Sequence, residues 1–513
     1  MKLKSQILKI ALFATGLSGI VAEYVLSTLA TYFLGNSVFQ WTMIVSIMLF
    51  SMGLGSRFSK YLEDKLLEKF ILIEFILSLL VAFVSVFTYL SAALIGLEAI
   101  VIYSLCIIIG LMIGMEIPLV IRINDEYQTL RLNISSAMEN DYYGSLLGGM
   151  FFAFVGLPHL GLSYTPFILG SINLIVALAL FTLLRDEVST KQFKKLIALA
   201  VLAASGIIAG SLTSKKAIEY GEKERYSDRV IYTEQTPYQR ITITQSKGEF
   251  WLFINGNQQL STIDEVMYHE PLVHPVMAIL RQPKSVLVLG GGDGGAVREI
   301  LKYPSVEKIT LVDLDPAMTN LGKEYPLLVA MNDNSMNHEK LSIINTDGYN
   351  YLEDTQDYFD AIIIDLPDPK SVELGRLYSF EFYKLCYRQL KPNGLIITQA
   401  GSPYYAARAF NCIDKTMSAS GFTTLPLHNQ VITLGEWGWV MGAKNIGKTQ
   451  LKNLVQNANL EDIQTRWMNE ESLTLITSFG KNSFPNQTDS VEINKIHNPV
   501  LFQYYLNGNW DIY

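Results

Sequence analysis

A glycine-rich turn between two apolar runs is the part of this sequence with the clearest chemistry. Residues Val286–Leu289 lead into Gly290–Gly295, which is GGGDGG, and a second apolar run, Ile309–Val312, ends at Asp313. This spacing predicts a strand, a tight turn, a helix and a second strand with an acid at its end. The glycines let backbone N–H groups approach a ligand, and an acid about 20 residues on is where a ribose diol is bound. The pattern therefore predicts a nucleoside site.

Asp293 lies inside that turn and indicates which kind of nucleoside fits. A dinucleotide would place its pyrophosphate there, and the carboxylate would be repelled by several kcal/mol at the effective dielectric of about 20 used for such sites. NAD and FAD are therefore disfavoured. S-adenosylmethionine and its decarboxylated form both carry a sulfonium, and the decarboxylated form has no carboxylate to oppose Asp293. We expect such a cationic nucleoside as a co-substrate and no prosthetic group.

Further acids follow the other expected strands. Asp347 and Gly348 come after the third strand, and Asp365 and Asp368 come after the fourth. Acids at the ends of four consecutive strands indicate a site, because ligands of such folds gather at the carboxyl ends of the strands. Capping of the next helix or turn is the alternative for Asp347 and Asp368. A second polar group lies upstream: Gln239, Gln259, Asp264, Tyr268, His269 and Glu270.

The elements that must position these residues alternate between strands and helices from residue 285 on. Expected strands cover 285–290, 308–313, 341–345, 360–365, 394–400, 422–426 and 436–442, and expected helices begin near 294, 316, 348, 379 and 403. This alternation predicts a doubly wound α/β sheet, Rossmann-like and similar to class I methyltransferases. Alternating apolar residues over 225–262 predict a small antiparallel sheet before it.

Residues 1–213 are much more apolar and predict a helical membrane domain. Seven candidate spans, each near the ~20 residues that a bilayer requires, cover 8–33, 38–56, 70–92, 95–121, 143–160, 164–184 and 195–213. Basic residues collect before the first span and after the second, fourth and sixth, which places the N-terminus in the cytoplasm. Seven spans would put residue 214 outside, whereas Lys215, Lys216, Lys223 and Arg225 favour the inside. Because sulfonium nucleosides are made and kept in the cytoplasm, we expect a multi-pass cell-membrane protein with a cytoplasmic catalytic domain.

Four regions follow from these patterns. We expect a transmembrane domain at 1–213, a small β-strand domain with a connecting helix at 214–280, a Rossmann-like catalytic domain at 281–445 and a C-terminal appendage at 446–513. The net charge of −8 argues against nucleic acid as a partner. The three cysteines lie far apart without metal-ligand or redox spacing, so we expect no metal site.

The segment Gln239–Ala443 resembles the polyamine aminopropyltransferase, or spermidine synthase, family. It carries the motifs YQ, NGxxQxxxxDExxYHExxxH, GGGDGG, the second-strand acid, DG and DxPDP, a highly specific combination. LYSFEFYKLCYRQLKPNGLIITQAGSPYY and LGEWGWVMGAK, behind several spans, are similar to the membrane-associated branch. The resemblance implies an enzyme that moves the aminopropyl group of decarboxylated S-adenosylmethionine to a diamine, usually putrescine. The products would be spermidine and 5′-methylthioadenosine, and a homo-oligomer is implied.

The resemblance also implies roles for the matching residues. Asp313 would accept both ribose hydroxyls, and Asp347 and Gly348 would contact adenine. Asp365 would be the base, because an alkylamine with a pKa near 10.4 must lose a proton before it attacks. The implied donor-binding residues are Gln239, Gly290, Gly292, Asp293, Asp313, Asp347 and Gly348. The implied acceptor-binding residues are Gln259, Tyr268, His269, Asp293, Asp365 and Asp368.

Two departures from the family pattern affect the acceptor. Many soluble members have DSxDPxGP after the fourth strand, whereas this chain has Asp365-Leu-Pro-Asp368-Pro followed by Lys370. An aromatic-proline-glycine stretch is replaced by Val431–Trp437. Agmatine, cadaverine or spermidine therefore stay open as acceptors beside putrescine.

Two other functions remain as alternatives. One is a methyltransferase that uses S-adenosylmethionine, which Asp293 and the Asp365–Asp368 pair disfavour. The other is a membrane polyamine transporter or sensor with a non-catalytic nucleoside-binding domain. Glu23 and Glu116 lie deep in the expected spans and could bind a polyamine cation or be hydrogen-bonded within the bundle, while Glu74 and Glu98 are expected to be solvated near span ends.

Overall fold

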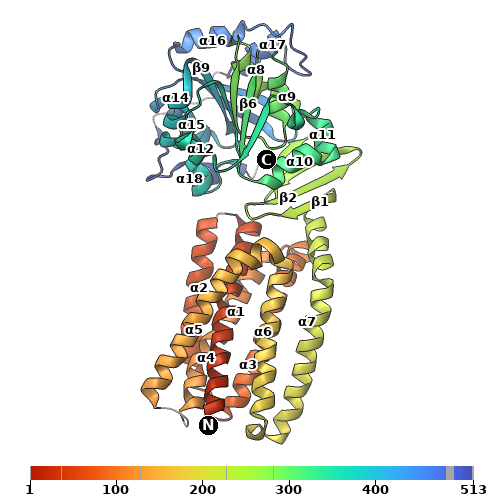
Figure 1. Ribbon diagram of the computed structural model, residues 1–513, viewed down its shortest axis with the longest axis vertical. Helices are drawn as coiled ribbons and strands as arrows, with labels where there is room; N and C mark the ends of the chain where they lie inside the picture. Colours follow the sequence, from red (N-terminus) through yellow and green to blue (C-terminus); the bar gives the residue numbers. More distant parts are fainter. Residues whose placement is uncertain are drawn as a thin grey trace. The chain divides into compact units, whose positions relative to one another are not determined.

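The chain divides into two compact units, Met1–Val230 and Ile231–Tyr513, in a computed structural model (Figure 1). The structure describes residues 2–35, 37–125, 129–226, 228–280, 282–480 and 490–510. Each unit has its own buried core, so each is described by itself.

The first unit consists of helices that run side by side (Figure 1). Six continuous helical stretches among the described residues are long and apolar enough to cross a membrane, and the fifth of them extends over 54 residues, Leu130–Leu183. The helices are α1 (Lys2–Leu34), α2 (Ser37–Ser59), α3 (Leu66–Ile95), α4 (Glu98–Asn124), α5 (Leu130–Phe151), the π-helix η1 (Phe152–Leu160), α6 (Gly161–Leu183), the 3₁₀ turn η2 (Arg185–Glu187) and α7 (Thr190–Arg225).

The 54-residue stretch folds back on itself. Ser145 of α5 donates to the carbonyl of Gly16, and Ser18 donates to the side-chain oxygen of Asn173 in α6. Ser145 and Asn173 would lie about 42 Å apart along a straight helix, yet both contact α1 within two residues. The reversal occurs at η1 and Gly161, which has a φ of 61°. Six stretches thus contain seven long α-helices, and the number of membrane crossings stays a prediction.

The predicted boundary at residue 213 lies too early. Helix α7 continues to Arg225, and the first unit ends at Val230. Hydropathy falls after residue 213, but Lys, Glu and Ala remain good helix formers, and Lys215 pairs with Glu219 one turn on at 4.0 Å. Composition marks the end of the apolar run, whereas hydrogen bonding and helix propensity set the end of the helix.

Helices α1, α3 and α7 of the first unit all begin at the same end of the bundle, the end near Lys65. Lys65, just before α3, donates to Ser189, just before α7, at 3.5 Å. At the opposite ends of these helices, a Cβ on Gly221 of α7 would lie 2.8 Å from the carbonyl of Tyr89 in α3. Phe33 of α1 also stacks edge-on against Tyr89. Helices α1, α3 and α7 therefore run in the same direction, and α7 ends at the bundle end away from Lys65.

The second unit begins with the expected small antiparallel sheet. Its strands are β1 (Arg229–Gln235), β2 (Arg240–Ser246), β3 (Glu249–Ile254) and β4 (Asn257–Ser261), in that order across the sheet. Apolar residues of β2 and β3, among them Ile241 and Leu252, pack on α10 (Pro316–Glu324) and α11 (Pro326–Met331). The small sheet therefore packs on the helices that follow the second strand of the larger sheet.

The predicted Rossmann-like sheet is confirmed. It has seven strands in the order β10-β11-β9-β8-β5-β6-β7. Among the strands described in this sheet, only β11 runs antiparallel to the others. The strands are β5 (Ser285–Gly290), β6 (Lys308–Asp313), β7 (Leu341–Asn345), β8 (Phe359–Asp365), β9 (Leu390–Gly401), β10 (Thr423–Val431) and β11 (Gly435–Ala443). On one side of β5 lie β6 and then β7, and on the other side lie β8, β9, β11 and β10. The strand order therefore reverses between β5 and β8.

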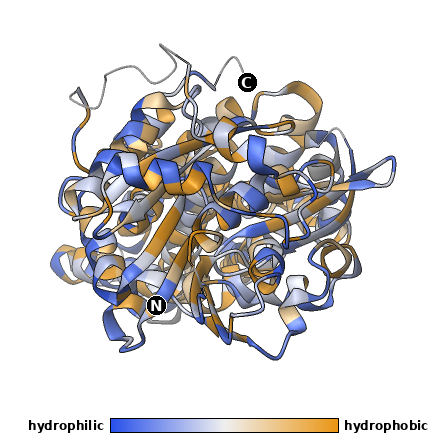
Figure 2. Cartoon of the chain, turned by 90° about the horizontal axis from the view of Figure 1, so that it is seen from above, coloured by the Kyte–Doolittle hydropathy of each residue, from blue (hydrophilic) through white to orange (hydrophobic). Residues whose placement is uncertain are grey.

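Helices cover both faces of this sheet (Figure 1). In β5, Val286 and Val288 join one buried cluster while Leu287 and Leu289 join the other, as the two-residue period of a strand requires. Hydrophobic residues run along central strands, and the loops around them are mostly hydrophilic (Figure 2). The remaining helices are α8 (Val266–Met277), α9 (Gly295–Leu301), α12 (Gly348–Asp354), α13 (Val372–Gly375), α14 (Phe380–Gln389), α15 (Ala407–Ala419), α16 (Lys448–Gln456), α17 (Glu470–Ile476) and α18 (Leu501–Leu506), with 3₁₀ turns at Ser335–Asn337 and Arg376–Tyr378.

Candidate active site

The candidate site lies where β5 and β8 end side by side. Gly290 is in register with Asp365, and the N–H of Gly291 donates to the carbonyl of Asp365 at 3.1 Å. Gly290 and Gly291 have φ values of 81° and 69°, and a Cβ on Gly290 would lie 2.0 Å from the Asp365 carbonyl oxygen. Only glycine fits this approach. The reversal of strand order at this point is where open α/β sheets bind ligands.

Three chemically active side chains converge at this point. One nitrogen of His269 and one carboxylate oxygen each of Asp293 and Asp365 all lie within 4.8 Å of one another. The Tyr268 hydroxyl donates to Asp365 Oδ1 at 2.7 Å, and the N–H of Gly295 donates to Asp293 Oδ1 at 2.8 Å. Helix α8 supplies Tyr268 and His269, the glycine turn supplies Asp293, and β8 supplies Asp365. Two parts of the predicted site, the upstream polar group and the acids at the strand ends, therefore lie together.

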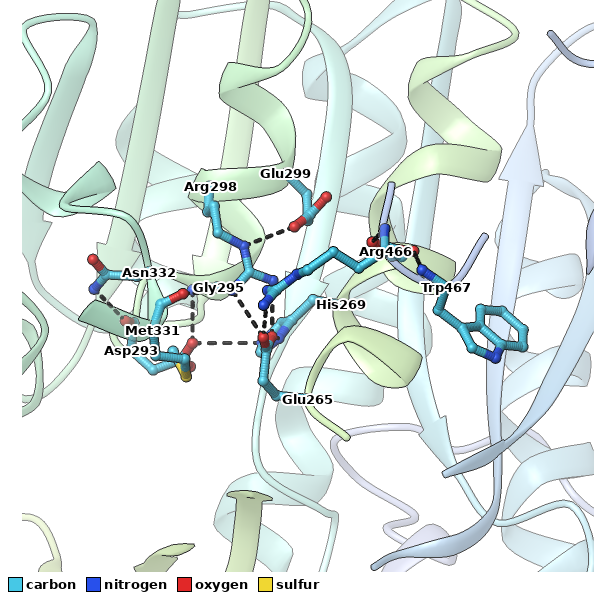
Figure 3. A network of polar contacts seen from close by, with 12 residues as sticks. Glu265, His269, Asp293, Gly295, Arg298, Glu299, Met331, Asn332, Arg466 and Trp467 are labelled. Atoms are coloured by element: carbon cyan, nitrogen blue, oxygen red, sulfur yellow. Dashed lines mark hydrogen bonds and ion pairs between the residues drawn. The ribbon is translucent and has the colours of Figure 1, made fainter. Parts of the chain in front are cut away.

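Both ring nitrogens of His269 face carboxylates. Nδ1 lies 2.8 Å from Glu265 Oε2, and Nε2 lies 3.4 Å from Asp293 Oδ1 (Figure 3). Burial alone would lower the pKa of His269, but the hydrogen bonds and charges of Asp293 and Glu265 raise it to about 10. Burial likewise opposes the charge of Asp293, yet His269 and the Gly295 N–H hold the pKa of Asp293 below its usual value. An imidazolium with both N–H groups donated to carboxylates has no lone pair left for a metal, so the cluster suits an organic cation.

Asp365 is the carboxylate of this cluster that can exchange a proton. Burial and the nearby Asp293 raise the pKa of Asp365 to about 6, against the opposing effects of His269 and Tyr268. A carboxylate with this pKa is ionised at neutral pH and is a better base than an exposed one. Its position, hydrogen-bonded by Tyr268 from one side, leaves it suited to accept a proton from a bound ammonium.

Asp313 lies at the end of β6 and is held by the backbone. Its Oδ2 accepts from the N–H of Gly292 at 3.2 Å and its Oδ1 from the N–H of Asp315 at 3.0 Å, while burial raises its pKa to about 6. Asp315 also accepts from the Thr236 hydroxyl at 2.8 Å, and the N–H of Gln239 donates to that hydroxyl oxygen at 3.0 Å. The small sheet thus brings Gln239 to the β6 side of the site.

Asp347 caps a helix and also pairs with an arginine. Its Oδ1 accepts from the N–H groups of Tyr349 and Asn350, both at 3.0 Å, and Arg376 Nη2 lies 2.5 Å from its Oδ2. Gly348 begins α12, and a Cβ there would contact Leu289 of β5 at 3.7 Å. The ordinary capping reading is therefore correct for Asp347, and a nucleoside-binding role would be additional.

Asp368 meets residues that sequence patterns did not indicate. Tyr505 of α18 donates to Asp368 Oδ2 at 2.6 Å, and the ammonium of Lys370 lies 3.8 Å from the same oxygen. Lys370 also donates to Asn257 Oδ1 of β4 at 2.7 Å, two residues before Gln259. The side-chain amide of Gln259 donates a hydrogen bond to the carbonyl of Asn257 at 3.1 Å. The C-terminal appendage predicted at 446–513 offers no motif that would have indicated Tyr505.

A layer of buried charges holds His269 from behind. Glu265 accepts from Arg298 at 2.9 and 2.8 Å and from Arg466 at 2.7 Å, beside its contact with His269 (Figure 3). His269 and Arg298 overcome the effect of burial and lower the pKa of Glu265 to about 2. Glu270, on the next turn of α8, accepts the backbone N–H groups of Arg466, Trp467 and Met468. The C-terminal appendage therefore helps to position α8, the helix that carries Tyr268 and His269.

Asp264 has a positioning role just before the start of α8. Its carboxylate accepts from the N–H and the hydroxyl of Thr433 at 2.6 and 3.1 Å. Thr433 lies in the β10–β11 turn, inside the stretch where this chain departs from soluble family members. The β10–β11 turn, which departs from the family pattern, is thus hydrogen-bonded directly to the segment that carries Tyr268 and His269.

Comparison with known proteins agrees with this geometry. Residues 265–453 match the family model described as the Spermine/spermidine synthase domain. The chain is 40% identical over 506 residues to polyamine aminopropyltransferase 2 of Aquifex aeolicus, covering 98% of each chain, and 39% identical over 490 residues to polyamine aminopropyltransferase of Leptospira interrogans, covering 95% of each. A crystal structure of spermidine synthase in complex with the transition state analogue AdoDATO is 30% identical, with a TM-score of 0.46 over 50% of this chain and 88% of that one. The chain belongs to the polyamine aminopropyltransferase family.

Proposed function

We propose that this aminopropyltransferase moves the aminopropyl group of decarboxylated S-adenosylmethionine to a short aliphatic diamine, putrescine first, giving spermidine and 5′-methylthioadenosine. The observation that carries the proposal is the convergence of Asp293, Asp365 and His269 at the β5–β8 switch point. Asp293 opposes phosphate and carboxylate groups but attracts an ammonium. A donor that ends in an ammonium fits this turn better than one that ends in an amino acid.

The reaction needs one proton transfer and one bond exchange. The acceptor amine is protonated near neutral pH, since alkylamines titrate near 10.4 like Lys. Asp365 takes that proton, and Tyr268 holds the carboxylate in place. The free amine then attacks the carbon beside the sulfonium, a C–N bond forms, and the C–S electron pair leaves with the neutral thioether. Much of the rate comes from holding two cations together that would otherwise repel each other.

The remaining residues divide between the two substrates. On the donor side, Asp313 binds the ribose hydroxyls, Gly290 and Gly292 let the nucleoside approach the backbone, and Asp347, Gly348 and Gln239 surround the base and sugar. On the acceptor side, Gln259, Tyr268, His269 and Asp368 line the path of the diamine with Asp365. The backbone contacts of Asp313 and the Thr236 bridge to Gln239 support the first group, and the Lys370 bridge between Asp368 and β4 supports the second.

An amine panel tests the proposed reaction. The purified chain is incubated with decarboxylated S-adenosylmethionine and putrescine, cadaverine, agmatine or spermidine, and the products are read by mass spectrometry. We expect an aminopropyl adduct and equimolar methylthioadenosine with at least one short diamine. Methyl transfer from S-adenosylmethionine, without aminopropyl transfer from the decarboxylated donor, would contradict the proposal.

Replacing Lys370 with methionine is expected to lower the KM for putrescine by roughly three- to tenfold, the effect of one partly screened charge. Lys370 lies in the acceptor region and neutralises Asp368, so it repels the far ammonium of a diamine. Methionine keeps much of the side-chain length without the charge. Lys308→Met is the matched control, because Lys308 pairs with Asp357 on the surface and should leave KM unchanged. A rise in KM in the Lys370 variant would show that Lys370 positions the acceptor instead.

We further propose that the first unit is embedded in the cell membrane and that the enzyme forms homo-oligomers. Length and composition of six helical stretches support the membrane location. The side of the membrane has two opposing arguments: the donor is a cytoplasmic metabolite, whereas α7 ends away from the basic bundle end near Lys65. We propose the cytoplasmic side, because an enzyme must meet its donor. A C-terminal reporter that is active only in the cytoplasm should be active, and an inactive reporter beside an active periplasmic one would contradict this.

A further inference from the structure

Two glutamates lie deep inside the helical unit. Glu74 of α3 is 0% exposed and Glu116 of α4 is 1% exposed. The expectation that Glu74 is solvated is wrong, because α3 begins at Leu66 and Glu74 lies more than two turns inside it. The charges of Glu74 and Glu116 act on each other, and Asp141 of α5 acts more weakly on Glu116. Three acids from three helices therefore share one region of the bundle.

These carboxylates have few partners. The Thr15 hydroxyl of α1 lies 3.2 Å from Glu74 Oε1. Among the described residues, Glu74 Oε2 and both oxygens of Glu116 are buried without a hydrogen bond, and neither glutamate takes part in an ion pair. Native proteins seldom leave buried carboxylate oxygens unmatched, because the charged form is costly without a partner. The arrangement lacks one positive charge.

The packing around the two glutamates limits the size of a cation that could bind there. A Cβ on Gly16 would lie 2.2 Å from the carbonyl oxygen and 3.0 Å from the carboxylate of Asp141, and a Cβ on Gly19 would lie 3.0 Å from Ile113. Helix α1 is thus packed closely against α4 and α5 beside the glutamates. Asn173 of α6, held by Ser18, is a further fully buried polar group in this part of the bundle. Such close helix packing favours a proton or a small ion over an alkyl diamine.

We propose that Glu74 and Glu116 form a binding site for one small cation, a proton or an alkali metal ion. The site uses carboxylate oxygens from α3 and α4, with the Thr15 hydroxyl as a neutral neighbour and Asp141 as a third negative group. Glu23 lies two turns further along α1 and acts on Cys106 instead. The proposal is independent of aminopropyl transfer, because all these residues belong to the first unit.

Carbodiimide labelling tests the site in the full chain in detergent. Dicyclohexylcarbodiimide converts a protonated carboxyl in apolar surroundings into a stable N-acylurea, which is located by mass spectrometry of peptides. Near pH 7, we expect Glu74 or Glu116 to be labelled at least roughly tenfold faster than Glu68, since a buried carboxylate without a partner is costly in its charged form. Glu68 is the matched control: it lies in the same helix but has Ser189 N–H and Lys65 as partners. Lower labelling in sodium or potassium chloride than in choline chloride identifies a metal ion, and no salt effect identifies a proton.

A second measurement covers the case of an inaccessible reagent. A cation bound to the folded state stabilises it, so the melting temperature of the parent should fall as pH rises in choline buffer or as alkali salt is removed. Glu116→Gln should lose this dependence, while Glu68→Gln keeps it, and methylthioadenosine release at the parent rate shows an intact catalytic unit. If Glu74 and Glu116 are labelled no faster than Glu68, and Glu116→Gln melts with the parent's pH and salt dependence, the pair holds no cation.

Discussion

Replacing Asp365 with asparagine is expected to lower kcat for aminopropyl transfer by about 10²–10⁴-fold, the usual loss when a positioned general base is removed. The amide has nearly the shape of the carboxylate, and its oxygen can still accept the Tyr268 hydroxyl that lies 2.7 Å from Asp365. The loss therefore reports the proton-accepting step and not a disturbed fold. The measurement is methylthioadenosine release at saturating donor and amine.

The pH profile provides a separate readout for the same residue. Burial and Asp293 raise the pKa of Asp365 to about 6, and only the ionised form can take a proton. The kcat of the parent should therefore fall as the pH drops below about 6, and the asparagine variant should lack this acid limb. Burial also raises the pKa of Asp313 to about 6, but in the proposed function Asp313 binds the donor, so saturating donor should keep its effect out of kcat.

Asp357→Asn is the matched control for this experiment. Asp357 lies on the surface just before β8 and pairs with Lys308 at 3.0 Å. Its replacement removes one negative charge from the same strand region without changing the site, so the parent rate is expected. Turnover at the parent rate in the Asp365 variant would show that another group accepts the proton.

Replacing Asp293 with asparagine is expected to reduce the preference for decarboxylated over intact S-adenosylmethionine by roughly 10- to 100-fold, because like charges placed together cost several kcal/mol. Asp293 is held ionised by His269 and by the N–H of Gly295, against the effect of burial. In the proposed function it would attract the ammonium that both donors carry and repel the carboxylate that only the intact donor carries. Titration calorimetry with both nucleosides gives the ratio of their dissociation constants.

Asp333→Asn serves as the control for the Asp293 variant. Asp333 is exposed in the turn after α11, next to Asn332, whose side chain donates to the Asp293 carbonyl. This substitution removes an exposed carboxylate whose sequence neighbour contacts Asp293, so the preference for the decarboxylated donor should not change. An unchanged ratio in the Asp293 variant would mean that this carboxylate does not face the end of the donor where the two nucleosides differ.

Local sequence was sufficient for the strands and for the acids at their ends. The predicted strand 308–313 is β6, and Asp313 ends it as expected. The first glycine of the run is explained by a close approach, since Gly290 must pass the Asp365 carbonyl. Strand periodicity, glycine turns and capping depend on neighbours within a few residues, and a pattern of such neighbours can be found in the sequence. For Asp347 this local reading gave two possibilities, and the cap is the one that the contacts show.

Distant contacts could not be predicted in the same way. Tyr505 reaches Asp368 across 137 residues, and Arg466 reaches Glu265 across 201. Each of these side chains stands in an ordinary polar or aromatic segment, and no spacing rule links it to its partner. The end of α7 at Arg225 also could not be predicted from hydropathy, because hydropathy measures how apolar a stretch is and not where its backbone hydrogen bonds stop.

By itself the sequence determined the class of chemistry, because strand ends, glycines and acids recur at spacings that only a nucleoside site with a cationic ligand explains. The tertiary structure decided which of those acids work together. It placed Asp293 and Asp365 around His269, assigned Asp347 to a helix cap and brought the C-terminal tail to Asp368. The physical reason is that a side chain's charge and proton affinity depend on burial and on partners supplied by packing, and packing joins segments that lie hundreds of residues apart.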